Sequence, residues 1–123
     1  MKSIFCSLAY AKLEIMQSHL VRANANTIKF IQDFFELAEA NGLEFSQTFE
    51  NSHNQITLSQ DRVTFFELDD AGHKAGIVIL SDGIMFSDID PESSFEDIEA
   101  TSDLFVRLSQ NLVKFANCLQ QQF

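Results

Sequence analysis

A series of strand-like segments joined by very short connections is the feature that most constrains how this chain can fold. Alternating or continuous apolar patterns occur in five closely spaced segments, residues 43–49, 56–58, 63–68, 77–80 and 84–86. Turn-forming residues such as Asn, Asp and Gly fill the connections between them. Connections this short cannot hold the crossover that parallel strands need, so each strand must pair antiparallel with the next. The sequence therefore predicts an antiparallel meander of about five strands.

The apolar run at residues 77–80 differs from its neighbours because it does not alternate with polar residues. Strands that are buried on both faces carry such continuous runs. We therefore expect this strand to lie centrally in the sheet, with both of its faces covered.

Two apolar stripes run along the first predicted helix, residues 3–23. One consists of Ile4, Leu8 and Ile15, and the other, about a third of a turn away, of Leu13, Met16 and Leu20. A face this wide predicts contact with two neighbours, one of which could belong to another chain. The alternative, that both neighbours lie within the same chain, stays open.

A second helix is predicted for residues 27–41, after an interruption at residues 24–27. The pair Asn41-Gly42 is a good helix stop, because glycine adopts the left-handed conformation at no steric cost. A single long, kinked helix stays open as an alternative, since the interruption contains no strong helix breaker.

The last helix is predicted to begin at Asp90-Pro91, or at Ser93 with Glu96 as its capping-box partner. Its apolar stripe consists of Ile98, Phe105, Leu108, Leu112, Ala116 and Leu119. The predicted fold class is thus α+β, with two N-terminal helices, the strand meander and one long C-terminal helix packed on the sheet. A chain of 123 residues has room for one core, so residues 1–123 are predicted to form a single domain.

Phenylalanine and acidic residues dominate the composition. Thirteen Phe and no Trp predict that most of the rings are buried in the fold or in an interface. Eighteen acidic against eight basic residues give a net charge of −10, which repels nucleic acids and anionic membranes. This charge favours a basic protein partner, or it serves solubility alone. No stretch approaches the roughly 20 apolar residues of a membrane span.

Cys6 and Cys118 are the only cysteines, and they lie far apart in the sequence. This usage does not make a disulfide scaffold, so we interpret them as buried, reduced thiols of a cytoplasmic protein. A bridge that joins the two ends of the chain stays open.

The stretch from Asp82 to Asp103 holds eight carboxylates and no Lys or Arg. Part of it, with Asp88, Asp90, Glu92 and Glu99, copies the ligand spacing of a calcium-binding EF-hand loop. Such a loop needs glycine at its sixth position, where this chain has Ser93, and it follows a helix rather than a strand. We therefore expect no metal here, and we interpret the carboxylates as favourable charges near a helix N-terminus.

The residues Asp69, Asp70, His73 and Lys74 share one predicted hairpin loop. A carboxylate beside an imidazole can orient a general base, but a solvated loop tip without a nucleophile is more plausible as a recognition element. The three histidines do not form a metal-ligand pattern, and no Gly-rich phosphate loop occurs. The sequence therefore predicts neither an enzyme nor a cofactor.

The function predicted from these patterns is that of a small acidic protein-interaction module (a binder, inhibitor or chaperone-like protein) that forms a homodimer. The expected partner-binding residues are Leu13, Met16, Leu20, Asp88, Asp90, Glu92, Glu96, Asp97 and Glu99. The alternative is a carrier or sensor of a small apolar ligand. Its pocket would be lined by Phe45, Phe49, Phe65 and Met85.

Overall fold

A computed structural model describes residues 4–42, 44, 46–90 and 92–122, without the side chains of Gln47 and of residues 118–122. The helices are α1 (Ile4–Ala23), α2 (Ala25–Ala40) and α3 (Phe95–Gln122), and the strands are β1 (Gln47–Glu50), β2 (Asn54–Leu58), β3 (Arg62–Leu68), β4 (Lys74–Leu80) and β5 (Gly83–Phe86). The predicted α+β order of helices and strands is confirmed.

The five strands form one antiparallel sheet in the order β1-β2-β3-β4-β5. Each strand pairs with the next along the chain, so that Phe65 lies opposite Ile77 and Ile77 lies opposite Phe86. The sheet is therefore the meander that the short connections require.

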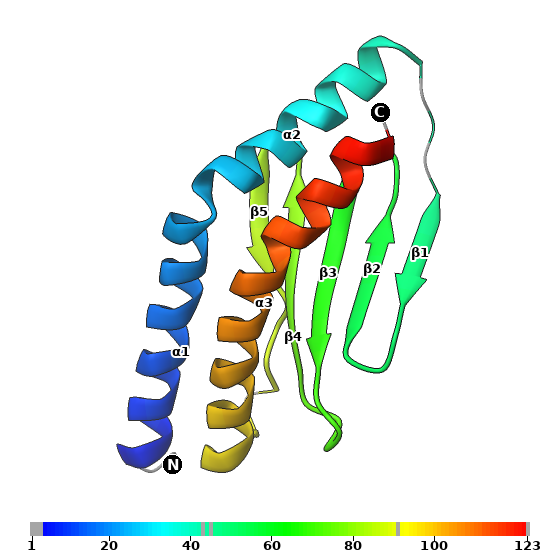
Figure 1. The fold of residues 1–123 in the computed structure, drawn as a ribbon. Helices are drawn as coiled ribbons and strands as arrows, with labels where there is room; N and C mark the ends of the chain where they lie inside the picture. The colour runs from blue at the N-terminus through cyan, green and yellow to red at the C-terminus, as the bar shows by residue number, and fades with distance from the viewer. Residues whose placement is uncertain (1–3, 43, 45, 91, 123) are drawn as a thin grey trace.

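The helices form a second layer on one face of this sheet (Figure 1). Helices α1 and α3 lie side by side and run in the same direction, while α2 crosses the end of the sheet. Two contacts mark the α1–α3 pairing: the rings of Phe5 and Phe95 are 6.2 Å apart, and Asn24 Nδ2 donates to Ser109 Oγ at 2.8 Å. The long C-terminal helix packs on β3 and β4 and confirms that part of the prediction.

The core lies between the two layers. Alternate residues of β3 and β4 point toward the helices and are buried, among them Phe65, Ile77 and Ile79. Edge-to-face ring contacts join the layers, with centroids 5.8 Å apart for Phe65–Phe115 and 5.5 Å apart for Phe86–Phe105.

The prediction that residues 77–80 are covered on both faces is wrong. Ile77 and Ile79 are fully buried, but Val78 and Leu80 are only half-buried. Successive side chains of a strand point to opposite faces, and the described helices all lie on the side of Ile77 and Ile79. The outer face of the sheet therefore carries apolar side chains that none of the described helices covers.

The boundary between the first two helices is a single residue, Asn24, rather than the longer interruption expected. Asn24 is buried, and its Nδ2 donates to Leu20 O at 3.0 Å as well as to Ser109. The side chain thus ties the boundary between the two helices to α3. The chain changes direction here (Figure 1), so two helices form instead of one long kinked helix.

Two other boundaries differ from expectation. Strand β1 begins at Gln47, so Glu44 and Ser46 of the predicted strand do not belong to it, and residues 43 and 45 lie outside the described part of the chain. Helix α3 begins at Phe95, and Ser94 Oγ accepts the N–H of Asp97 at 3.2 Å. The capping pair is therefore Ser94 with Asp97, one residue later than the predicted Ser93 with Glu96.

The parallel arrangement of α1 and α3 excludes a bridge between the two cysteines. Cys6 follows Phe5, which contacts Phe95 at the start of α3. The side chain of Cys118 is not described, but its backbone lies 23 residues further along α3, about 35 Å away at the rise of an α-helix. A disulfide requires Cα atoms within about 7 Å. Among the described residues, no helix is long and apolar enough to cross a membrane.

Candidate interaction surface

An apolar stripe on α1 points into solvent. Ile4 is 71% exposed, Leu8 is 60% exposed and Ile15 is 58% exposed, and the exposed Ala11 lies between the last two. Their spacing of four, three and four residues places all four side chains on one line along the helix. We call these four residues the α1 stripe. Exposed apolar residues in a continuous line usually mark an interaction site, whereas scattered ones do not.

The other stripe of the same helix is buried inside the chain. Leu13 is 4% exposed, Leu20 is fully buried and Met16 packs against the core at its margin. Helix α3 contacts this side of α1, and no described helix covers the opposite side. Leu13 and Leu20 are therefore not available to a partner. The helix has two apolar stripes, as the sequence predicts, but the neighbour of one is α3 and the α1 stripe is the one left open.

The predicted acidic partner-binding residues lie in the segment before α3 and in the first turns of that helix. Asp88, Glu92 and Glu96 are exposed, and Glu99 is half-buried. Asp90 has hydrogen-bond partners within the chain. Its Oδ1 accepts the N–H of Glu92 at 2.9 Å, and its carbonyl oxygen accepts the hydroxyl of Tyr10 at 3.3 Å. Within the described part of the chain, no group of three His, Cys, Asp or Glu residues could hold a metal ion.

The sixth acidic residue, Asp97, belongs to a different arrangement. His73 lies between two carboxylates: its Nδ1 is 2.8 Å from Asp69 Oδ2, and its Nε2 is 2.8 Å from Asp97 Oδ1. The hydrogen bond to Asp97, and then that to Asp69, raises the pKa of His73, while partial burial opposes the shift. Hydrogen bonds to His73 lower the pKa of Asp97, and at Asp69 they outweigh a desolvation that would raise it.

This arrangement holds the β3–β4 hairpin against the start of α3. Both ring nitrogens of a protonated His73 donate to carboxylates, so neither has a lone pair to accept a proton as a general base. The two contacts of His73 thus join the hairpin to the first turn of α3. The pairing of His73 with Asp69 could be read from the hairpin sequence, but Asp97 lies 24 residues further along the chain and only the fold brings it there.

The four residues predicted to line a Phe-rich pocket do not come together. Phe65 is buried in the core, while Met85 is 50% exposed on the outer face of the sheet. The register explains the separation, because Met85 pairs with Val78 and Phe65 pairs with Ile77, which point to opposite faces. Phe49 lies at the sheet edge, partly exposed, and Phe45 lies outside the described residues. The predicted pocket wall is therefore wrong.

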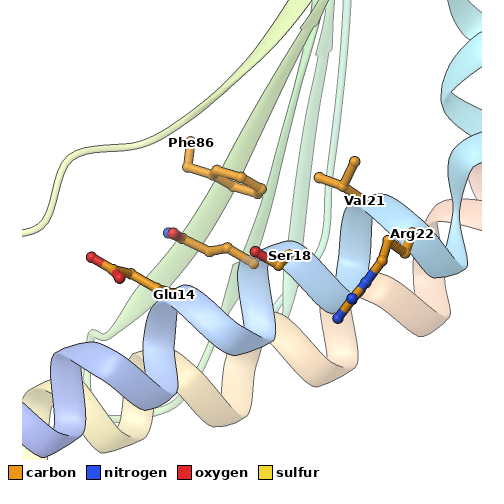
Figure 2. Close-up of a pocket in the computed structure, with 6 residues that line it drawn as sticks. Glu14, Ser18, Val21, Arg22 and Phe86 are labelled. Carbon is orange, nitrogen blue, oxygen red and sulfur yellow. The ribbon is translucent and has the colours of Figure 1, made fainter.

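A groove of about 610 Å³ lies between α1 and β5 (Figure 2). Its lining consists of Glu14, Gln17, Ser18, Val21, Arg22 and Phe86. The Phe86 ring faces α1, whereas the guanidinium of Arg22 points away from that ring. Ligand pockets for apolar molecules are lined mainly by apolar side chains, whereas four of these six lining residues are polar or charged.

A buried polar cluster, which sequence reasoning missed, connects β2, β3 and α3. Glu67 is only 2% exposed, and its Oε2 accepts hydrogen bonds from Asn54 Nδ2 and, at 2.9 Å, from Asn111 Nδ2. Arg107 Nε lies 3.6 Å from its Oε1. A buried carboxylate needs such partners, so the cluster fixes the position of α3 on the sheet.

The outer face of the sheet is a second apolar surface. Its apolar side chains are Phe66, Leu68, Val78, Leu80 and Met85. The Phe66 ring lies over Gly76, where any side chain would overlap it, and Lys74 Nζ is 5.2 Å from the ring centroid. This packing covers part of the apolar area, and Met85 is the exposed member of the set.

Comparison of the chain with models of protein families, with curated proteins and with solved structures finds no match.

Proposed function

We propose that this protein is a non-enzymatic interaction module that works as a homodimer and that the α1 stripe is its dimer interface. The observation that carries the proposal is the exposure of Ile4, Leu8 and Ile15 on the side of α1 opposite to its buried stripe. A helix of a one-chain fold needs only one apolar side, and the second side costs solubility unless something covers it.

A second copy of the chain fits this stripe because of its spacing. Side chains repeated every four and three residues form the seam of a two-helix coiled coil, in which each helix offers the other the same line of side chains. A seam of this length, with its flanking residues, buries on the order of 1,000 Å² in total, at the lower end for specific interfaces. The expected dissociation constant is on the order of micromolar.

Light scattering coupled to size-exclusion chromatography tests the dimer over a concentration series in the micromolar range. The wild-type protein should shift from monomer to dimer, and Leu8→Glu should remain monomeric because each copy would bury an unpaired carboxylate in the apolar seam. Leu37→Glu is the matched control, since Leu37 is also a helical leucine and is 64% exposed on α2. A wild-type protein that stays monomeric, or a Leu8→Glu protein that dimerises like the control, contradicts the proposal.

A further inference from the structure

We infer that the two α1 helices of this dimer run antiparallel, with Ile4 of one copy packed against Ile15 of the second copy. The inference rests on the proposed function and specifies how its partner surface is arranged. In this register the two-fold axis passes between Leu8 and Ala11, so that each Leu8 packs against Ala11 of the second copy.

Side-chain size favours the antiparallel register. A parallel seam would place Ala11 against Ala11 of the second copy. The other layers of that seam would consist of two isoleucines or two leucines. Two facing alanines leave a gap, and a gap in an apolar interface loses the contacts of the atoms that surround it. The antiparallel register pairs the small Ala11 with the large Leu8, which gives four layers of more equal size.

The residues that flank the α1 stripe are compatible with this register. Lys12 and Phe5 lie on one side of the seam, and Glu14 and Ser7 lie on the other. In an antiparallel pair, Lys12 comes near Phe5 of the second copy and Glu14 comes near Ser7, so like charges do not meet. Phe5 and Lys12 are already positioned by α3, through the ring contact with Phe95 and an ion pair of 3.6 Å between Lys12 Nζ and Asp103 Oδ1.

The charges near the two ends of α1 also favour the antiparallel register. The first turns of α3, which carry Glu96, Asp97 and Glu99, lie beside the start of α1 because Phe5 contacts Phe95. The other end of α1 carries His19 and Arg22, both exposed. An antiparallel pair brings the basic end of each α1 toward the acidic end of the second copy, whereas a parallel pair brings two acidic ends together.

Disulfide cross-linking distinguishes the two directions. In a protein without its own cysteines (Cys6→Ser and Cys118→Ser), Ile4→Cys and Ile15→Cys are prepared separately and then mixed. Antiparallel helices place residue 4 next to residue 15 of the second copy, and they hold two residues 4, or two residues 15, about 16 Å apart along the seam. Only the mixture should then give linked dimers, identified by mass spectrometry as a 4–15 bridge. Leu37→Cys measures linkage by random collision.

The outcomes separate this inference from the proposed function. Linkage in the mixture alone supports the antiparallel register. Linkage of Ile4→Cys with itself and of Ile15→Cys with itself, above the Leu37→Cys level, overturns the register and leaves the dimer through α1 intact. Light scattering is recorded on each variant and on the cysteine-free parent. If the parent is a monomer throughout the micromolar range and linkage never exceeds the control, the proposed function fails together with the register.

Discussion

The Nε2 atom of His73, in the β3–β4 hairpin, lies 2.8 Å from Oδ1 of Asp97, in the first turn of α3. The contact joins two elements that are separated by the whole of β4 and β5. The other ring nitrogen is held by Asp69, so the imidazole is oriented from both sides. The hairpin that looks from sequence like a free recognition loop is thus partly engaged within the chain.

The stability that His73 provides should depend on pH. Because the pKa of His73 is raised above 6.5 in the folded state, the folded protein binds this proton more tightly than the unfolded chain. Its contribution is full below pH 6.5 and is lost as the pH rises through the raised pKa. The pKa values of Asp69 and Asp97 are lowered from 3.8, so their contribution is lost as the pH falls below that value.

His73→Gln should therefore lower the melting temperature most between about pH 4 and pH 6.5 and least at alkaline pH. Thermal unfolding followed by circular dichroism at a series of pH values measures the difference from wild type. His53→Gln, an exposed histidine in the β1–β2 turn, is the control. A difference that is constant across the range would show that protonation of His73 contributes nothing.

Truncation of a side chain should have different effects in the buried and the exposed apolar stripe of α1. Leu13→Ala removes a buried side chain and should lower the free energy of unfolding by about 2–5 kcal/mol. Ile15→Ala should change it by about 0.5 kcal/mol or less in the monomer, but it should weaken the dimer. Urea unfolding at a concentration where light scattering reports monomer gives the first quantity, and the monomer–dimer series gives the second. Equal destabilisation by both variants would show that Ile15 is part of the core.

Gly76 is required by a close approach within the sheet. A methyl group at this position would overlap the Phe66 ring and the Ser87 hydroxyl, so Gly76→Ala should cost about 1–3 kcal/mol of unfolding free energy. Gly83→Ala, in the neighbouring strand, meets no atom within 4 Å and should be close to neutral. Adding Phe66→Leu should recover part of the loss at Gly76, and failure to recover any would mean that the ring is not the cause.

The buried polar cluster around Glu67 should lose stability when the carboxylate of Glu67 is replaced by an amide. Glu67→Gln gives up the charge near Arg107 and places an amide donor among the two amide donors of Asn54 and Asn111. The expected cost is about 1–3 kcal/mol of unfolding free energy, because buried hydrogen-bonding groups are left without partners. Urea unfolding measures it, with the exposed Glu50→Gln as control. A Glu67→Gln protein as stable as the control would mean that the cluster does not need a carboxylate.

The local part of the fold could be read from the sequence because it depends on nearest neighbours along the chain. The short connections require the antiparallel order of the strands, and helical periodicity identifies α1, α2 and α3 before any contact is known. The one-residue error at Ser94 arises because several capping residues compete at the start of a helix.

The site depended on tertiary structure. Periodicity shows that α1 has two apolar stripes, but only the packing of α3 decides that Leu13 and Leu20 are buried and that Ile4, Leu8 and Ile15 are exposed. Likewise, the run at residues 77–80 reads as buried on both sides, and only the placement of all described helices on one side leaves Val78 and Leu80 half-exposed. A sequence determines which faces are apolar, whereas burial depends on which other surface lies close in space, and that is a property of the whole fold.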